Sequence, residues 1–175
     1  MGVRISWRRK RALVYPIQPP PKTAVLVPWF RSNGLVRVFT GGWTEEAAAF
    51  APCAIAATPA QLDALAASKS PSLSHAVIAL TRLGEPRLSE AGRDRFWAAF
   101  RVPVFEQIIG ERGELLAAEC EAHDGLHIES EKPPPDKMPD KMKVDASPCA
   151  CGRKTPRLVP TDPREMLRRV AAYAR

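Results

Sequence analysis

The sequence lacks any apolar run that could form the core of a signal peptide or span a bilayer. Residues 8–11 are basic, but no apolar segment follows them, whereas a signal peptide needs one and a membrane helix needs about 20 apolar residues. We therefore expect a soluble cytoplasmic protein with no membrane span. Cysteine is also scarce: three of the four cysteines lie near histidine or glycine, which suits a reducing compartment where thiols bind metal.

Acidic residues are absent from residues 1–22, which carry six basic ones. Residues 23–131 hold nine basic and fourteen acidic residues, and residues 132–175 hold eleven and five. The net charge of +7 therefore comes from two basic ends around a mildly acidic body. Such ends can bind nucleic acid, an anionic membrane surface or an acidic protein, or they can stay solvated and bind nothing in particular.

The chain has 175 residues, 45% of them hydrophobic, and can bury one ordinary core. We predict four segments. They are a basic, proline-rich tail (residues 1–22), an α/β domain (23–130), a proline- and lysine-rich linker or loop (131–147), and a C-terminal segment with a Cys-x-Cys pair and a helix (148–175).

Short apolar runs alternate with helical segments that begin after the capping residues Thr44, Thr58 and Ser89. The helix after Ser89 should turn Trp97 inward with its phenylalanines. This alternation predicts an α/β fold with one small sheet of five or six strands and covering helices. The predicted strands are residues 23–27, 35–39, 53–57, 75–80, 102–107 and 115–119, the first two forming a hairpin.

A final amphipathic helix is predicted from residue 163 to residue 174. Asp162 and Glu165 form a capping pair at its start. Its apolar stripe must pack on the body of the protein or on a partner, and consists of Met166, Leu167, Val170 and Tyr173.

Two groups of potential metal ligands stand on either side of the proline-rich segment. Cys120 lies close to His123 and His127, and Cys149 is two residues from Cys151. Three cysteines and one histidine can complete a tetrahedral zinc site, and four protein ligands leave no open position for substrate. The pattern predicts structural Zn²⁺. The alternative is a buried Cys120 with two loop thiols and solvated histidines.

Several segments resemble, in the same order, the middle of the phenylacetate-CoA ligases, which belong to the adenylate-forming acyl-CoA ligase superfamily. They are residues 41–46, 51–59, 84–86, 102–106, 118–128 and 149–153. The resemblance covers roughly residues 36–131 and 148–158. It implies a ligase-like α/β fold and a zinc ion held by Cys120, His127, Cys149 and Cys151, with His123 as the alternative ligand.

The sequence departs from this family in the motifs that bind nucleotide. No Ser/Thr/Gly-rich phosphate loop precedes Gly41. The family's Tyr-Gly-x-Ser/Thr-Glu motif, which stacks on adenine, corresponds here to residues 109–114, where Ile109 replaces the aromatic residue. A ribose-binding aspartate motif and the C-terminal lid with its catalytic lysine have no counterpart. The resemblance therefore implies a reduced, non-catalytic relative, and we assign no catalytic residue.

Other polar residues have simpler interpretations. We expect Cys53 to be a small core residue within its strand. Surface solvation is the commoner explanation for the acidic side chains near the expected sheet edge, which are Glu85, Glu106, Glu111 and Glu114.

Three functions remain open. The first is a non-catalytic, zinc-stabilised accessory or assembly protein that engages a larger protein partner. The second is a protein that binds an acyl-CoA, an aryl acid or a nucleotide, or that forms one part of a split ligase. The third is a nucleic-acid-binding protein that acts through its basic ends.

Overall fold

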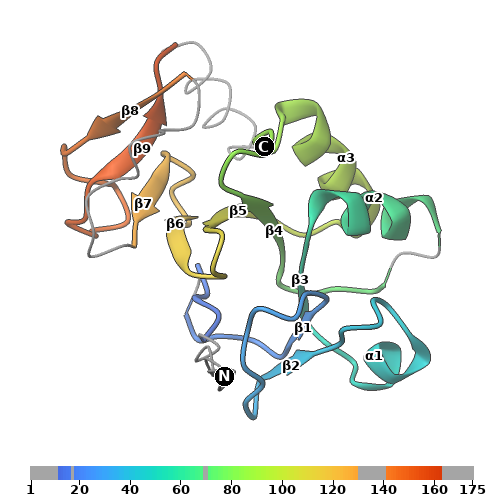
Figure 1. Cartoon of the computed structure of the whole chain (residues 1–175). Coiled ribbons are helices and arrows are strands. Elements are labelled where there is room, and N and C mark those ends of the chain that lie inside the picture. Colours follow the sequence, from blue (N-terminus) through green and yellow to red (C-terminus); the bar gives the residue numbers. More distant parts are fainter. Residues whose placement is uncertain (1–11, 17, 69–70, 130–140, 163–175) are drawn as a thin grey trace, which may run out of the picture.

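Nine strands form one mixed sheet in the computed structural model, which describes residues 12–16, 18–68, 71–129 and 141–162 (Figure 1). The strands are β1 (Thr23–Val25), β2 (Val36–Val38), β3 (Ala54–Ala57), β4 (Ala76–Arg82), β5 (Val104–Ile109), β6 (Leu115–Glu119), β7 (Leu126–Ile128), β8 (Met142–Asp145) and β9 (Arg157–Pro160). Their order across the sheet is β2-β1-β3-β4-β5-β6-β7-β9-β8.

The α/β class is confirmed, but the sheet has nine strands in the described residues rather than five or six. The three unpredicted strands are β7, β8 and β9. Each has only three or four residues, and β8 contains Lys143 and Asp145 and lacks a fully buried side chain. Their pairing comes from backbone hydrogen bonds to neighbouring strands, so the sequence gives no apolar pattern by which to find them.

Part of the predicted linker is therefore folded. Residues 142–145 form β8, which pairs antiparallel with β9. Residues 130–140 and the predicted helix at residues 163–174 lie outside the described residues.

Half of the sheet is parallel and carries the helices on one face. Strands β2, β1, β3, β4 and β5 pair in parallel. Helices α1 (Glu45–Ala49), α2 (Pro59–Ala67) and α3 (Glu90–Phe100) pack on this half through one apolar cluster. The predicted hairpin of the first two strands is wrong, because Thr23 pairs with Val36 in a parallel register. Asn33 instead ends the crossover loop by accepting the Leu35 and Val36 amides at 2.8 Å.

The helices begin at the predicted capping residues. Thr58 and Gln61 form a reciprocal capping box, and Ser89 accepts the Gly92 amide. Phe96 and Phe100 lie one turn apart and are buried, whereas Trp97 is 51% exposed. The prediction that Trp97 points inward is wrong because one residue advances the helix by about 100° and moves this side chain off the buried stripe.

The opposite face of the parallel strands is covered by loops and by the N-terminal segment. Phe30 and Tyr15 pack there against the strands, and Gln107 Nε2 donates to the Val14 carbonyl at 2.6 Å. Residues 12–16 of the predicted tail thus belong to the core, while residues 1–11, including the basic run, lie outside the described residues.

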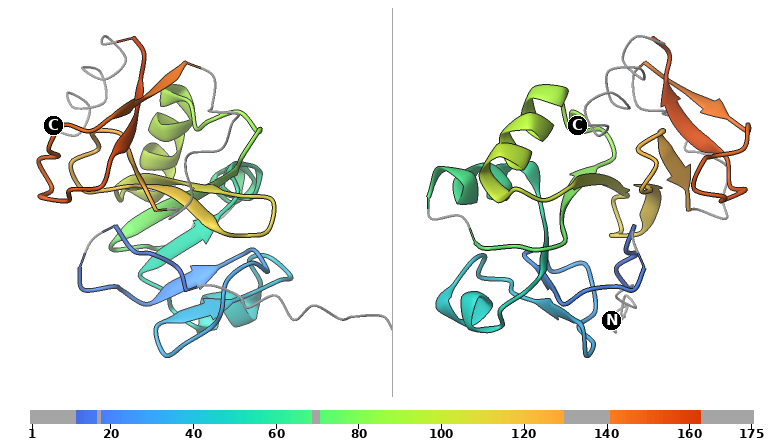
Figure 2. Two further views of the ribbon diagram at one scale, coloured as in Figure 1. Left: turned by 60° about the vertical axis from the view of Figure 1, so that its left-hand side comes forward. Right: turned by 180° about the vertical axis from the view of Figure 1, so that it is seen from behind.

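The second half of the sheet is antiparallel. It continues from β5 through β6, β7 and β9 to β8. The right-hand view of Figure 2 shows this half extending away from α2 and α3. Its small core joins Ile108 and Ala117 to Leu126 and Leu158.

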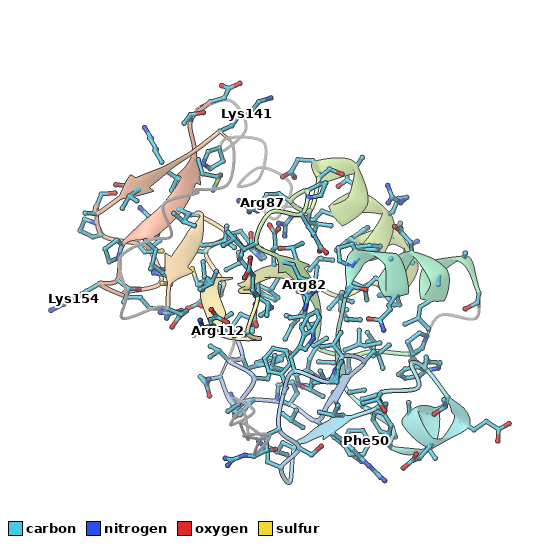
Figure 3. All side chains as sticks on the ribbon, in the orientation of Figure 1. Phe50, Arg82, Arg87, Arg112, Lys141 and Lys154 are labelled. Atoms are coloured by element: carbon cyan, nitrogen blue, oxygen red, sulfur yellow. The ribbon has the colours of Figure 1, made fainter. Side chains whose placement is uncertain are left out.

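Buried ion pairs connect the helical side to the strands. Glu106 is fully buried, so its predicted solvation is wrong. Its carboxylate accepts Arg87 Nε at 2.9 Å, the Leu88 amide at 3.0 Å and the Thr81 hydroxyl at 3.1 Å. Arg87 also contacts the sulfur of Met142 at 3.3 Å, which places it between the β8–β9 hairpin and α3 (Figure 3).

A second pair joins α3 to β6. Arg93 Nη1 lies 2.9 Å from Glu119 Oε2, and both side chains are almost fully buried. Burial raises the pKa of Glu119, but Arg93, His123 and the Glu106 amide outweigh it and lower the pKa to about 2. Glu119 is therefore a carboxylate at neutral pH.

Replacing Arg93 tests how much this ion pair contributes to the stability of the fold. We expect Arg93→Met to lower the free energy of unfolding by about 3–5 kcal/mol, since it leaves a buried carboxylate without its cation. Urea unfolding followed by far-UV circular dichroism measures the loss.

Arg95 supplies the matched control in the same helix. It pairs with Asp63 at 2.9 Å, but both side chains are about half exposed, so Arg95→Met should cost less than about 1 kcal/mol. Equal losses in the two variants would contradict the importance of the buried pair.

Candidate metal centre

Four potential ligands meet where the β6–β7 turn faces the β8–β9 loop. Cys120 directly follows β6, His127 lies within β7, and Cys149 and Cys151 belong to the loop between β8 and β9. Their ligand atoms all lie within 4.8 Å of one another. The antiparallel pairing of β6, β7 and β9 thus brings together residues that are 31 positions apart at most.

Tight turns present the sulfur atoms. The His123 amide donates to the Cys120 carbonyl at 3.0 Å, and the Gly152 amide donates to the Cys149 carbonyl at 3.0 Å. Gly125 precedes β7 with φ +88, and a Cβ there would lie 2.7 Å from the Leu158 carbonyl oxygen. Glycine is therefore needed for the close approach of β7 to β9.

The distances between the ligand atoms fit tetrahedral coordination of one ion. Cys120 Sγ and Cys149 Sγ are 3.7 Å apart, and Cys151 Sγ lies 3.3 Å from His127 Nε2. A tetrahedron with zinc–sulfur bonds of about 2.3 Å separates two sulfurs by roughly 3.8 Å, and a sulfur and a nitrogen by roughly 3.6 Å. Four such ligands can hold one metal ion.

His127 is oriented as a ligand by its other ring nitrogen. Its Nδ1 lies 3.1 Å from the Thr155 carbonyl oxygen and 2.9 Å from the Thr155 hydroxyl. A carbonyl only accepts, so the proton sits on Nδ1 and the Nε2 lone pair faces Cys151. Burial is the main cause that lowers the pKa of His127, which keeps the imidazole neutral at pH 7, as a metal ligand must be.

The thiols differ in their proton affinity. Burial raises the pKa of Cys120, and the neighbouring sulfurs raise it further against the opposing Ala122 amide. Burial also raises the pKa of Cys149, but hydrogen bonds from the Cys151 amide and from the neighbouring thiols, together with the Arg157 charge, lower it overall. A divalent cation would favour all three thiolates.

The remaining candidate residues lie elsewhere. His123 stacks on Phe105 with ring centroids 4.7 Å apart, and its Nδ1 lies 3.2 Å from Glu119 Oε1. Cys53 precedes β3 and is only partly buried, so its predicted place within a core strand is wrong. Sequence reasoning missed Thr155 and Arg157, which carry no spacing signal of their own.

The turn that follows β5, at residues 110–114, is closed by its own hydrogen bonds. Ile109 is fully buried in the core. The Arg112 amide donates to Glu114 Oε2 at 2.9 Å, and the Gly110 amide donates to the Glu114 carbonyl at 2.8 Å. Glu114 therefore closes its own turn.

The chain shares its fold with part of an acyl-CoA ligase. No protein family model matches it, and no curated protein does so significantly. A solved structure of a 2-hydroxyisobutyryl-CoA ligase, in an open conformation with 2-HIB-AMP and CoA, matches with a TM-score of 0.55 and 17% identity. The match covers 83% of this chain and 45% of that ligase. The chain thus spans less than half of the ligase it resembles.

Substituting one ligand tests the centre. We expect Cys149→Ala to lose the bound metal and to lower the free energy of unfolding. The loss should be roughly 3–4 kcal/mol when free metal exceeds its dissociation constant 100- to 1,000-fold. Metal analysis and thermal unfolding of the same sample measure both effects.

Cys53→Ala is the control, because it removes a thiol outside the cluster. It should keep the metal and its response to a chelator. An unchanged melting curve and full metal content in Cys149→Ala would rule the centre out.

Proposed function

We propose that this protein is a zinc-stabilised, non-catalytic module built on an acyl-CoA ligase fold, acting in the cytoplasm as an accessory or assembly protein for a larger protein partner. Its Cys/His elements are those of a phenylacetate-CoA ligase-like relative. The observation that carries the proposal is the clustering of Cys120, His127, Cys149 and Cys151, whose ligand atoms all lie within 4.8 Å of one another.

Zinc is favoured over other metals by the donor set. Three thiolates and one imidazole suit Zn²⁺, whereas Mg²⁺ and Ca²⁺ prefer oxygen ligands. Four protein ligands fill a tetrahedral shell, so the ion would stabilise the fold rather than activate water. Its contribution would fall on the antiparallel half, where the strands are short.

The closed loop after β5 supports the non-catalytic part. The position of the adenine-stacking aromatic is held by Ile109, whose side chain is buried. Glu114, which would take the place of the motif's acid after a one-residue shift, accepts a hydrogen bond from the loop amide of Arg112. The Ile109 side chain thus faces the core, and the Glu114 carboxylate is engaged by its own turn.

The partner is proposed from charge and sequence. Both ends of the chain are basic around an acidic body, which favours an acidic surface on the partner. The predicted helix at residues 163–174 supplies an apolar stripe. No helix in the part of the chain that the structure describes is long and apolar enough to cross a membrane.

A small-molecule role is the second candidate, because the ligase with the similar fold was solved with 2-HIB-AMP and CoA. The chain would then bind an acyl-CoA, an aryl acid or a nucleotide at the carboxyl ends of the parallel strands, or supply one part of a split ligase.

Metal analysis combined with ligand screening tests the proposal. Protein purified without added metal should contain about one zinc per chain, and a chelator should lower its unfolding midpoint. ATP, AMP, CoA and aryl acids should leave the midpoint unchanged.

Zinc-free protein with a chelator-insensitive midpoint would contradict the stabilising role. A rise in the midpoint with a nucleotide or an acyl-CoA would instead favour the ligand-binding candidate.

A further inference from the structure

One buried arginine connects the two loops that carry the metal ligands. Arg157, the first residue of β9, is 2% exposed. Its Nη1 donates to the Asp124 carbonyl at 2.8 Å and forms an ion pair with the Asp124 carboxylate. Its Nη2 donates to Asp145 Oδ2 at 2.8 Å and to Ser147 Oγ at 3.0 Å.

These partners flank the ligands in sequence. Asp124 lies in the turn between Cys120 and His127, and Ser147 lies two residues before Cys149. A single guanidinium therefore ties the β6–β7 turn to the β8–β9 loop. The position of each sulfur relative to the other loop depends on this contact.

The charge of Arg157 also acts on the cluster. Its Nε is buried and has no hydrogen-bond acceptor among the described residues. The positive charge of Arg157 is one of the causes that lower the pKa of Cys149. Arg153, the other arginine of this region, pairs instead with Glu129, and its side chain is 35% exposed.

Charge counting shows why a cation is needed there. Three thiolates and a neutral imidazole around a divalent ion leave one excess negative charge. Cys120 and Cys149 are buried, and an uncompensated charge in such a place is costly. Asp124 and Asp145 add further negative charge next to the site.

We propose that Arg157 is a positioning residue of the metal centre, which offsets the excess negative charge of a three-thiolate, one-imidazole zinc site and holds its two ligand loops together. The proposal rests on the zinc centre of the proposed function. It adds a determinant of metal affinity that lies outside the four ligands.

Zinc affinity in Arg157 variants tests this role. Competition with a chromophoric chelator gives the dissociation constant, and Co²⁺ substitution reports the ligands through its thiolate absorption bands. We expect Arg157→Gln to weaken zinc binding by about 10- to 100-fold, with a Co²⁺ spectrum that still shows three thiolates. The fold should persist because Asp124 and Asp145 are 30% and 28% exposed and can be solvated by water.

Two further variants separate charge from general packing. Arg157→Lys keeps the charge and should recover most of the affinity lost in Arg157→Gln. Arg95→Gln removes a distant, half-exposed ion pair with Asp63 and should bind zinc like the unaltered protein.

The outcomes are distinct. Wild-type affinity in Arg157→Gln, or equal losses in Arg157→Gln and Arg157→Lys, would overturn charge compensation by Arg157. If Arg157→Gln does not fold, Arg157→Lys decides alone, with near-wild-type affinity in support and a tenfold or greater loss against. Absence of zinc from the unaltered protein would instead refute the proposed function.

Discussion

The junction between the β6–β7 turn and the β8–β9 loop is the constraint on which the antiparallel half of the sheet depends. Strands β8 and β9 have four residues each, too few to hold a hairpin in place by backbone pairing alone. The junction adds the thiol–imidazole cluster and the buried Arg157, which contacts both loops. A metal ion there would join segments that a short hairpin core cannot join.

The parallel half is stabilised differently. Its strands are buried on one face by three helices and on the other by loops and by residues 12–16. The Arg87–Glu106 ion pair joins the helical side to β5, and the Arg93–Glu119 ion pair joins it to β6. The chain shares its fold with part of a CoA ligase, and Ile109, the last residue of β5, is fully buried in this half.

Much of the parallel half could be predicted because its signals are local. The capping box at Thr58 and the apolar run of β4 each lie within a few residues. The burial of Glu106 could not be predicted, since its partner Arg87 is 19 residues away in sequence and contacts it only in the folded protein. The direction of the β1–β2 pair could not be predicted for a different reason, because a turn at Asn33 fits either a hairpin or a crossover.

The sequence by itself determined the α/β class, the helix starts and the supply of three cysteines and two histidines near the candidate metal centre. Tertiary structure decided which of them come together. Cys120, His127, Cys149 and Cys151 converge because β7 pairs with both β6 and β9, whereas His123 is turned away to Phe105 and Glu119. It also placed Arg157 between the ligand loops. Residue type sets which chemistry is available, but strand pairing over long sequence separations sets which atoms meet.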